Sequence, residues 1–219
     1  MTQQRWKTEK SLYNADTKKQ GNEIIKKLDY DTVYRREFLE CDPLQDWESF
    51  YRCINLWNIF LNKINKIQDK NWCVLDCGSK DTQFAAWLRT QGIMSIGLEY
   101  SQEYVRYSLN KGRPVRYGNV CNMEFEDNEF DIVTSHHLLG LVPSNLIALN
   151  EMFRVSKKWM YSLTSVPGNK RKHFSYLEDN SIFNQFIEDN KDDCKVIYND
   201  FISKETGYNG EYLIIVEKI

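Results

Sequence analysis

Two acidic residues stand where they could bind one ligand together. Asp76 and Glu99 each end a short apolar run, residues 72–75 and residues 93–98, and Gly78 followed by a helix-like segment lies between them. Short apolar runs ended by a polar residue are typical of buried strands in a parallel sheet. A strand, a turn, a helix and a second strand bring the strand ends and the helix N-terminus to one crevice. The spacing therefore predicts a nucleotide-binding unit whose crevice lies beside both acids.

The histidines are the candidate bases. His136 and His137 follow a further apolar run, residues 130–135, and His173 lies in a later polar segment. Adjacent side chains on extended backbone point to opposite sides, so one of the pair is expected to face the crevice. An imidazole with a pKa of about 6.5 can remove a proton from a hydroxyl or an amine. The alternatives are a structural role for the pair beneath the sheet and a solvated surface for the basic run 170–172 beside His173.

The composition excludes several classes of function. The 219 residues are 27% charged, with a formal net charge of −2 and a pI of about 6.0, so no global basic field attracts nucleic acid or anionic lipid. No stretch approaches the roughly 18 consecutive apolar residues of a membrane span, and the polar beginning lacks the apolar core of a signal peptide. Six cysteines without a CxxC pair favour reduced thiols over a metal site or a disulfide framework. We expect a cytoplasmic protein without a metal.

The first 70 residues are expected to form a helical extension, and residues 71–219 the ligand-binding core. Apolar residues spaced alternately three and four apart predict a helix near the end of the extension, with one buried stripe. The stripe consists of Trp47, Phe50, Ile54, Trp57, Leu61, Ile64 and Ile67. We expect the extension to close over the crevice as a lid, with Trp6, Tyr34 and Arg35 as candidate contacts to a substrate.

The remaining elements define the fold class. Further strands are predicted at residues 114–117, 130–135, 159–166, 194–202 and 212–216, and helices at residues 101–110, 145–155 and 178–189. Alternating strands and helices imply a mainly parallel sheet, and the closing pair of strands, separated by a turn, implies an antiparallel edge. The prediction is an α/β fold with a Rossmann-like, seven-stranded, mainly parallel sheet, an antiparallel last strand and helices on both faces.

Four blocks of sequence carry a resemblance to a known family. They are VLDCGSKD (residues 74–81), GLEYS (97–101), YGNVCNMEFEDNEFDIVTSHHLL (117–139) and LNEMFRVSKKWMYSL (149–163). Their order and spacing resemble those of class I S-adenosylmethionine-dependent methyltransferases with a type 11 methyltransferase domain. The resemblance covers about the last two-thirds of the chain. It implies a Rossmann-like fold that binds S-adenosylmethionine and releases S-adenosylhomocysteine.

The resemblance also implies roles for individual residues. Glu99 follows Gly78 by about the interval at which an acid meets ribose hydroxyls, and the alternative is a solvated strand end. Asn119 stands where the family usually has an acid that binds the adenine amino group, and an amide oxygen can accept the same bond. Asp76 would engage the amino end of the methionine moiety, or else cap the turn. The full set of implied cofactor contacts is Asp76, Gly78, Ser79, Lys80, Glu99, Tyr100, Asn119, Val120 and Ser135.

The chain departs from the family pattern in three places. Residues 79–82 occupy a loop in which the family has further glycines, and Asp81 is expected to be the N-cap of the following helix. Lys80 would meet the methionine carboxylate or face water. Residues 140–141 replace a Glu-His pair, which alters the substrate side, and residues 157–158 replace a Pro-Gly-Gly turn, which shortens a loop.

The expected function is methyl transfer to an O or N nucleophile of a small molecule or a glycan-like metabolite. His137 or His136 is the candidate base, and Tyr34, Arg35 and His173 are candidate substrate contacts. One alternative is a methyltransferase-like binding or regulatory subunit without turnover, and another is a nicotinamide-dependent oxidoreductase, against which the missing second and third glycines count. We expect a monomer or homodimer without a membrane partner. RNA stays open as a substrate, whereas residues 134–137 lack the tetrad of exocyclic-amine DNA methyltransferases.

Overall fold

Seven strands form one sheet at the centre of the computed structural model, which describes residues 47–165, 181–202 and 210–219. The strands are β1 (Cys73–Cys77), β2 (Met94–Glu99), β3 (Val115–Tyr117), β4 (Phe130–His136), β5 (Ser156–Ser165), β6 (Cys194–Phe201) and β7 (Glu211–Lys218). The helices are α3 (Trp47–Lys63), α4 (Gln83–Thr90), α5 (Gln102–Asn110), α6 (Asn145–Val155) and α7 (Ser181–Asp189), together with the short 3-10 helix η2 (Leu139–Leu141).

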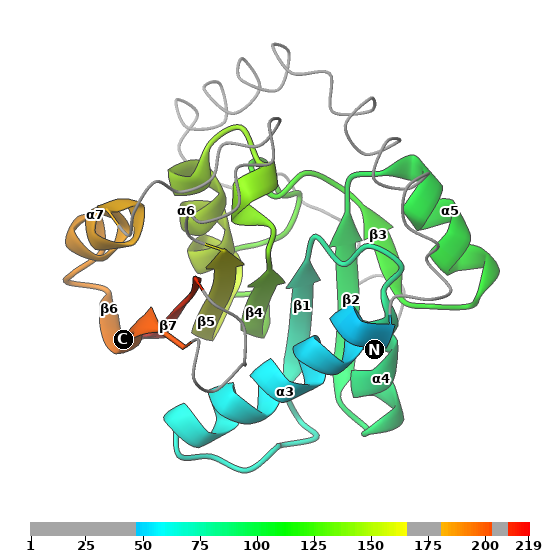
Figure 1. Ribbon diagram of the computed structural model, residues 1–219, viewed down its shortest axis with the longest axis horizontal. Helices are drawn as coiled ribbons and strands as arrows, with labels where there is room; N and C mark the ends of the chain where they lie inside the picture. The colour runs from blue at the N-terminus through cyan, green and yellow to red at the C-terminus, as the bar shows by residue number, and fades with distance from the viewer. Residues whose placement is uncertain (1–46, 166–180, 203–209) are drawn as a thin grey trace.

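The strand order in the sheet is β3-β2-β1-β4-β5-β7-β6. The pairs among β1 to β5 are parallel, whereas β7 is antiparallel to both of its neighbours, β5 and β6. The predicted Rossmann-like, seven-stranded sheet with an antiparallel last strand is therefore confirmed, although β7 lies inside the sheet and β6 forms its edge. The order reverses between β1 and β4, and in Figure 1 these strands and β2 end at the same upper edge. Such a switch point is where open α/β sheets bind ligands.

Helices cover both faces of the sheet because alternate strand residues are apolar on both sides. In β1, Val74 belongs to the core under α3 and α4, and Leu75 to the core under α6 and α7. Phe60 of α3 stacks on Tyr161 of β5 with 4.7 Å between the ring centroids. Phe186 of α7 is completely buried on the other face. Burying one side chain of this size contributes about 1.5–3 kcal/mol, so both layers hold the strand ends in place.

The helix predicted from the apolar stripe exists, but its end and its buried face differ from the prediction. The structure ends α3 at Lys63, and Ile67 lies beyond it with 88% of its surface exposed. The most buried side chains of α3 include Leu56 and Phe60, which the predicted stripe omitted. A spacing that alternates three and four averages 3.5 residues per turn, and the real helix has 3.6, so the predicted face drifts by about 20° per heptad.

The chain passes from α6 into β5 without a loop, as the missing Pro-Gly-Gly turn suggested. Val155 ends the helix and Ser156 begins the strand. Lys218 of β7 donates hydrogen bonds from Nζ to the carbonyl oxygens of Phe153, Arg154 and Ser156 at 3.0, 3.3 and 3.1 Å. A cation at a helix C-terminus satisfies carbonyls that have no partner in the helix. Lys218 therefore stabilises the end of α6, where the family has a Pro-Gly-Gly turn.

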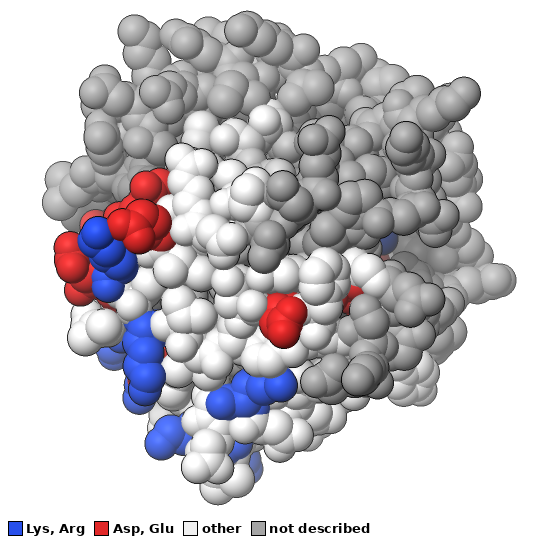
Figure 2. Space-filling model, turned by 60° about the vertical axis from the view of Figure 1, so that its left-hand side comes forward, with Lys and Arg blue, Asp and Glu red and all other residues white. Residues whose placement is uncertain are grey.

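The side of the molecule that carries α7 and β6 bears both acidic and basic side chains, as Figure 2 shows. One exposed pair there joins Lys191 Nζ to Glu188 Oε1 at 2.7 Å. Among the helices that are described, none combines the length and the apolar character needed to cross a membrane.

Candidate functional site

The loop after β1 keeps a glycine-like backbone with few glycines. Gly78, Lys80 and Thr82 have φ angles of 70°, 47° and 62°, all in the left-handed region that side chains disfavour. The loop is held to β2, because the N–H groups of Gly78 and Ser79 both donate to Leu98 O, at 2.8 and 3.2 Å. Every second residue of the loop thus takes the conformation that glycine would adopt most easily.

Side chains under the loop fix this conformation. Thr82 is completely buried, and its Oγ1 donates to Ser108 Oγ of α5 at 3.1 Å. A Cβ atom on Gly97 of β2 would lie 2.2 Å from Ser79 Oγ, so the loop rests directly on the strand. Ser79 therefore packs its side chain against β2, and the cofactor contact that the resemblance implies for it stays a prediction.

The expected N-cap at Asp81 is wrong. The cap position of α4 is Thr82, whose side chain makes no cap hydrogen bond. Asp81 instead accepts from Arg113 Nη1 at 2.9 Å and from Gln83 Nε2 at 2.6 Å through the same carboxylate oxygen. The guanidinium of Arg113 competes for the carboxylate that an N-cap would need. The same contact joins the loop to the segment before β3.

Glu99 joins the loop to the start of α5. Its Oε2 accepts the N–H of Lys80 at 2.9 Å and its Oε1 accepts the N–H of Ser101 at 2.8 Å. Only 1% of the residue is exposed, and this burial raises the pKa of Glu99 to about 7 although the backbone donors lower it. The backbone N–H of Tyr100 is a third donor to this carboxylate, and a carboxylate with about four lone-pair sites can still accept from a further donor.

Asp76 and His136 form a buried pair under the switch point. His136 Nδ1 lies 3.7 Å from Asp76 Oδ1, and its ring packs edge-on against Phe84 and tilted against Tyr161. Burial, reinforced by the charges of Glu99 and Asp81, raises the pKa of Asp76 to about 8. Burial also lowers the pKa of His136 to about 3, so this imidazole is neutral near pH 7 and a weak base. The pair fits the structural alternative for His136 and leaves His137 as the candidate base.

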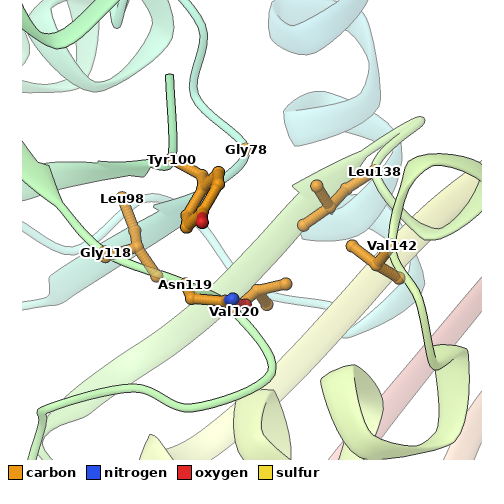
Figure 3. Close-up of a pocket in the computed structure, with 8 residues that line it drawn as sticks. All are labelled: Gly78, Leu98, Tyr100, Gly118, Asn119, Val120, Leu138 and Val142. Atoms are coloured by element: carbon orange, nitrogen blue, oxygen red, sulfur yellow. The ribbon is translucent and has the colours of Figure 1, made fainter. Parts of the chain in front are cut away.

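A narrow cleft opens above Gly78 at the ends of β1, β2 and β4. It is lined by Gly78, Leu98, Tyr100, Gly118, Asn119, Val120, Leu138 and Val142, and its empty space is about 280 Å³. Figure 3 shows Tyr100 on one side and Leu138 and Val142 on the other, with Asn119 and Val120 forming the base between them. This space includes open solvent, and the room left for the centre of a water-sized sphere is only about 10 Å³. Small-molecule sites commonly measure about 300–1,000 Å³, so the cleft is nearly closed.

The segment after β3 presents the base of the cleft. Asn119 Oδ1 accepts the N–H of Cys121 at 2.8 Å, and Asn119 and Asn122 form an isolated bridge. Met123 N–H donates to Glu151 Oε2 at 2.6 Å, which ties the same segment to α6. The amide oxygen of Asn119 keeps one lone-pair site for a ligand.

Residues 75–159 match the model of the family described as a methyltransferase domain. This match lies on the strands, loop and cleft just described. Over these residues the chain resembles a methyltransferase domain.

One known protein is similar to part of this sequence, and others are similar in fold. The demethylmenaquinone methyltransferase of Staphylococcus haemolyticus (strain JCSC1435) is 38% identical over 66 residues, which are 28% of this chain and 28% of that relative. The fold of the methyltransferase domain is shared with the PH0226 protein from Pyrococcus horikoshii OT3, with a TM-score of 0.65, 15% identity and coverage of 85% of this chain and 99% of that one. It is also shared with the magnesium protoporphyrin IX methyltransferase from Synechocystis PCC 6803, solved with bound SAM, at a TM-score of 0.61 and 11% identity over 88% and 98% of the two chains.

Only some of the predicted cofactor residues lie at the cleft. Gly78, Tyr100, Asn119 and Val120 line the cleft. Asp76 and Glu99 are buried at the ends of β1 and β2, and Lys80 contributes its backbone N–H to Glu99. Ser135 is completely buried, and its hydroxyl lies 2.8 Å from that of Ser162, so it does not line the cleft. Trp6, Tyr34, Arg35 and His173 lie outside the described residues.

His137 follows β4 and lies among residues that the sequence did not single out. Its Nδ1 lies 3.0 Å from Ser165 Oγ at the end of β5, and its Nε2 lies 3.2 Å from Glu211 Oε1 at the start of β7. The next residue, Leu138, lines the cleft. Neither Ser165 nor Glu211 belongs to a motif, and only the register of β5 with β7, which pairs these two residues, places them together.

Proposed function

We propose that this chain transfers the methyl group of S-adenosylmethionine to an oxygen or nitrogen nucleophile on a small molecule or glycan-like metabolite. The observation that carries the proposal is the fixed carboxylate of Glu99. Two backbone N–H groups hold it at the end of β2, directly before Tyr100, which lines the cleft. A carboxylate held by backbone donors in this position can still accept from a ribose hydroxyl. The methyltransferase domain supports the same cofactor.

The residues around the cleft fit the parts of this cofactor. Tyr100 and Val120 offer flat and apolar surfaces to an adenine, and Asn119 offers an amide oxygen to its amino group. Gly78, at positive φ and without a side chain, leaves room for the methionine part to cross the turn. Asp76 lies below this turn, where its carboxylate would stabilise an ammonium group. When bound, the cofactor supplies a methyl group on a sulfonium, which is already electrophilic.

The cleft must widen to admit the cofactor. A Cβ atom on Gly78 would lie 2.7 Å from Leu138 Cδ1, so the Leu138 side chain rests on the turn that the methionine part would cross. Rotation of Leu138 would open this space. The chain then contributes alignment of the acceptor, exclusion of water and removal of one proton, because the sulfonium needs no further activation.

The alternative is a binding or regulatory subunit without turnover. The narrow cleft and the glycine-poor loop favour this alternative, whereas the retained positive φ angles of Lys80 and Thr82 favour a working loop. The two functions share the cofactor site and differ in turnover.

Calorimetric titration with S-adenosylhomocysteine tests the proposal. We expect binding in the micromolar range or tighter, and NADH in a parallel titration should give none. The absence of S-adenosylhomocysteine binding at high micromolar concentration would overturn the proposal. Binding without methyl transfer to any member of a broad panel of hydroxyl and amine compounds would favour the regulatory alternative.

A further inference from the structure

Three side chains from neighbouring strands meet beside the cleft, outside the residues proposed to bind the cofactor. They are His137, which follows β4, Ser165, which ends β5, and Glu211, which begins β7. The three strands are adjacent in the sheet, and Ser165 is the register partner of Glu211. Their positions in the sequence are far apart, so the fold alone brings them together.

The backbone of His137 is turned out of the strand. Its φ of 53° is left-handed, while its N–H still donates to Leu163 O of β5 at 2.8 Å. His136 therefore points into the core beside Phe84, and His137 points across β5 towards Glu211. A left-handed histidine is an uncommon and mildly strained conformation that persists where the surroundings determine it.

Each ring nitrogen of His137 has a polar neighbour. Nδ1 faces a hydroxyl and Nε2 faces a carboxylate. An ionised Glu211 can only accept, so a relay through His137 requires the proton of the neutral ring on Nε2, the nitrogen that faces it. Nδ1 would then hold the lone pair, to which the Ser165 hydroxyl, 3.0 Å away, can donate. Nε2 is buried and lies 3.2 Å from the carboxylate without an aligned hydrogen bond. Catalytic contacts are often misaligned before the substrate is bound.

Burial strengthens this arrangement. Glu211 is 3% exposed, whereas about a third of the His137 side chain is open to solvent. A buried carboxylate stabilises positive charge on the neighbouring ring more strongly than an exposed one would, because the local dielectric is low. The open side of the imidazole faces outward, and its chain neighbour Leu138 lines the cleft.

We propose that Ser165, His137 and Glu211 form a proton relay for the acceptor, with Glu211 as the positioning residue. The inference rests on the proposed function. The acceptor oxygen or nitrogen bonds to the methyl carbon as the carbon–sulfur bond breaks and its electron pair returns to sulfur. The acceptor proton passes to Ser165 Oγ while the proton of Ser165 passes to Nδ1 of His137. Glu211 then faces the imidazolium that results.

Histidine NMR tests the relay without a known acceptor. The chain has three histidines, so ¹⁵N-histidine labelling gives a short spectrum, and the signal lost in His137→Asn is that of His137. We expect neutral His137 to carry its proton on Nε2. Glu211→Met should remove this preference, and Glu211→Gln, which retains an acceptor oxygen, should restore it. A proton on Nδ1 in the wild type, or the same tautomer in Glu211→Met, would overturn the proposal.

Measurement of turnover is the second test of the relay. Release of S-adenosylhomocysteine from S-adenosylmethionine is measured with a panel of phenols, catechols and primary alcohols. General-base assistance contributes about 10²–10⁴-fold, so Ser165→Ala and Glu211→Met should each lower kcat at least tenfold at unchanged KM for the cofactor. Ser162→Ala, on the same strand, should change neither constant by more than about twofold. Equal kcat in wild type and Ser165→Ala would overturn the relay.

The two proposals fail in different ways. The tautomer of His137 is measured without cofactor, so it does not depend on cofactor binding. Loss of S-adenosylhomocysteine binding in the wild type would contradict the proposed function alone. Binding with equal affinity in the wild type and Glu211→Met, together with an unchanged tautomer, would contradict the relay alone.

Discussion

The proposed cofactor side and the proposed acceptor side of the cleft are built in different ways. The cofactor side, formed by residues 78–82 and Glu99, is held by backbone hydrogen bonds within one stretch of sequence. The acceptor side joins His137, Ser165 and Glu211 through side chains from three strands. A contiguous unit with backbone contacts tolerates changes of side chain, whereas a cluster of side chains does not.

The largest expected effect is that of a side chain at Gly78. Gly78→Ala introduces a Cβ at 2.7 Å from Leu138 Cδ1 and at a φ of 70°, so it combines a clash with backbone strain. We expect a loss of about 2 kcal/mol or more in the free energy of unfolding and at least 100-fold weaker binding of S-adenosylhomocysteine. Chemical denaturation and calorimetry measure both.

Gly112 offers the matched control, because it has a φ of 66° and nothing within 4 Å of its added Cβ. Gly112→Ala should cost about 1–2 kcal/mol of strain and leave ligand affinity unchanged. Equal effects of the two substitutions on affinity would show that the turn at Gly78 is not part of the ligand site.

The next prediction compares one residue from each side of the cleft, Glu99 and Glu211. Glu99→Gln keeps the size of the side chain but replaces one acceptor oxygen by a donor, which faces a backbone N–H of Lys80 or Ser101. We expect at least tenfold weaker binding of S-adenosylhomocysteine, whereas Glu211→Gln should leave it within about twofold. Calorimetry on the two variants, at matched concentration, measures the affinity of each for S-adenosylhomocysteine. Similar losses in both would break the division of the cleft into two sides.

A third effect is the pH dependence of binding. The raised pKa values of Asp76 (about 8) and Glu99 (about 7) mean that both acids are largely protonated below pH 7 in the free protein. A bound ammonium or sulfonium favours the ionised carboxylates, so binding releases protons and affinity rises with pH up to about 8. The slope is at most tenfold per pH unit for each proton released.

Calorimetry in buffers of different ionisation enthalpy counts these protons. Asp76→Asn should reduce the proton release by up to one and flatten the upper part of the curve. Affinity that falls as pH rises from 6 to 8 would contradict the placement of the cationic end of the ligand near Asp76.

The smallest effect concerns Lys80. It contributes its backbone N–H to Glu99 while its φ of 47° favours glycine, so Lys80→Gly should change the free energy of unfolding by less than about 1 kcal/mol. Lys80→Ala, which retains a Cβ at the same φ, should be no more stable than Lys80→Gly in denaturant titrations. S-adenosylhomocysteine affinity should stay within about threefold in both. A tenfold loss in both would instead assign the Lys80 side chain to the ligand carboxylate.

The sequence predicted the cofactor side better than the acceptor side, for physical reasons. Strands, turn and acids over residues 71–100 follow from local patterns. The helix predicted at residues 101–110 spans Gln102–Asn110, and its N-cap, Ser101, accepts from Tyr104 N–H. The N-cap at Asp81 failed because Arg113, 32 residues away, takes its carboxylate. Ser135 is a cofactor contact implied by the resemblance, and the parallel register pairs it with Ser162, whose hydroxyl lies 2.8 Å from its own.

Of the three residues of the proposed relay, His137 was predicted from the sequence as a candidate base, whereas Ser165 and Glu211 could not be. Ser165 and Glu211 lie in strands whose alternation fixes only which face each side chain takes. Their approach to His137 depends on β7 lying beside β5 and not at the edge of the sheet, and strand order is a property of the whole fold. The candidate contacts Tyr34, Arg35 and His173 stay predictions.

A crystal structure with S-adenosylhomocysteine tests the central claim most directly. We predict adenine between Tyr100 and Val120, ribose hydroxyls on Glu99, the homocysteine crossing Gly78 with Leu138 rotated away, and sulfur facing the side of His137. A ligand bound elsewhere, or a cleft that stays closed by Leu138 at saturating ligand, would contradict the account.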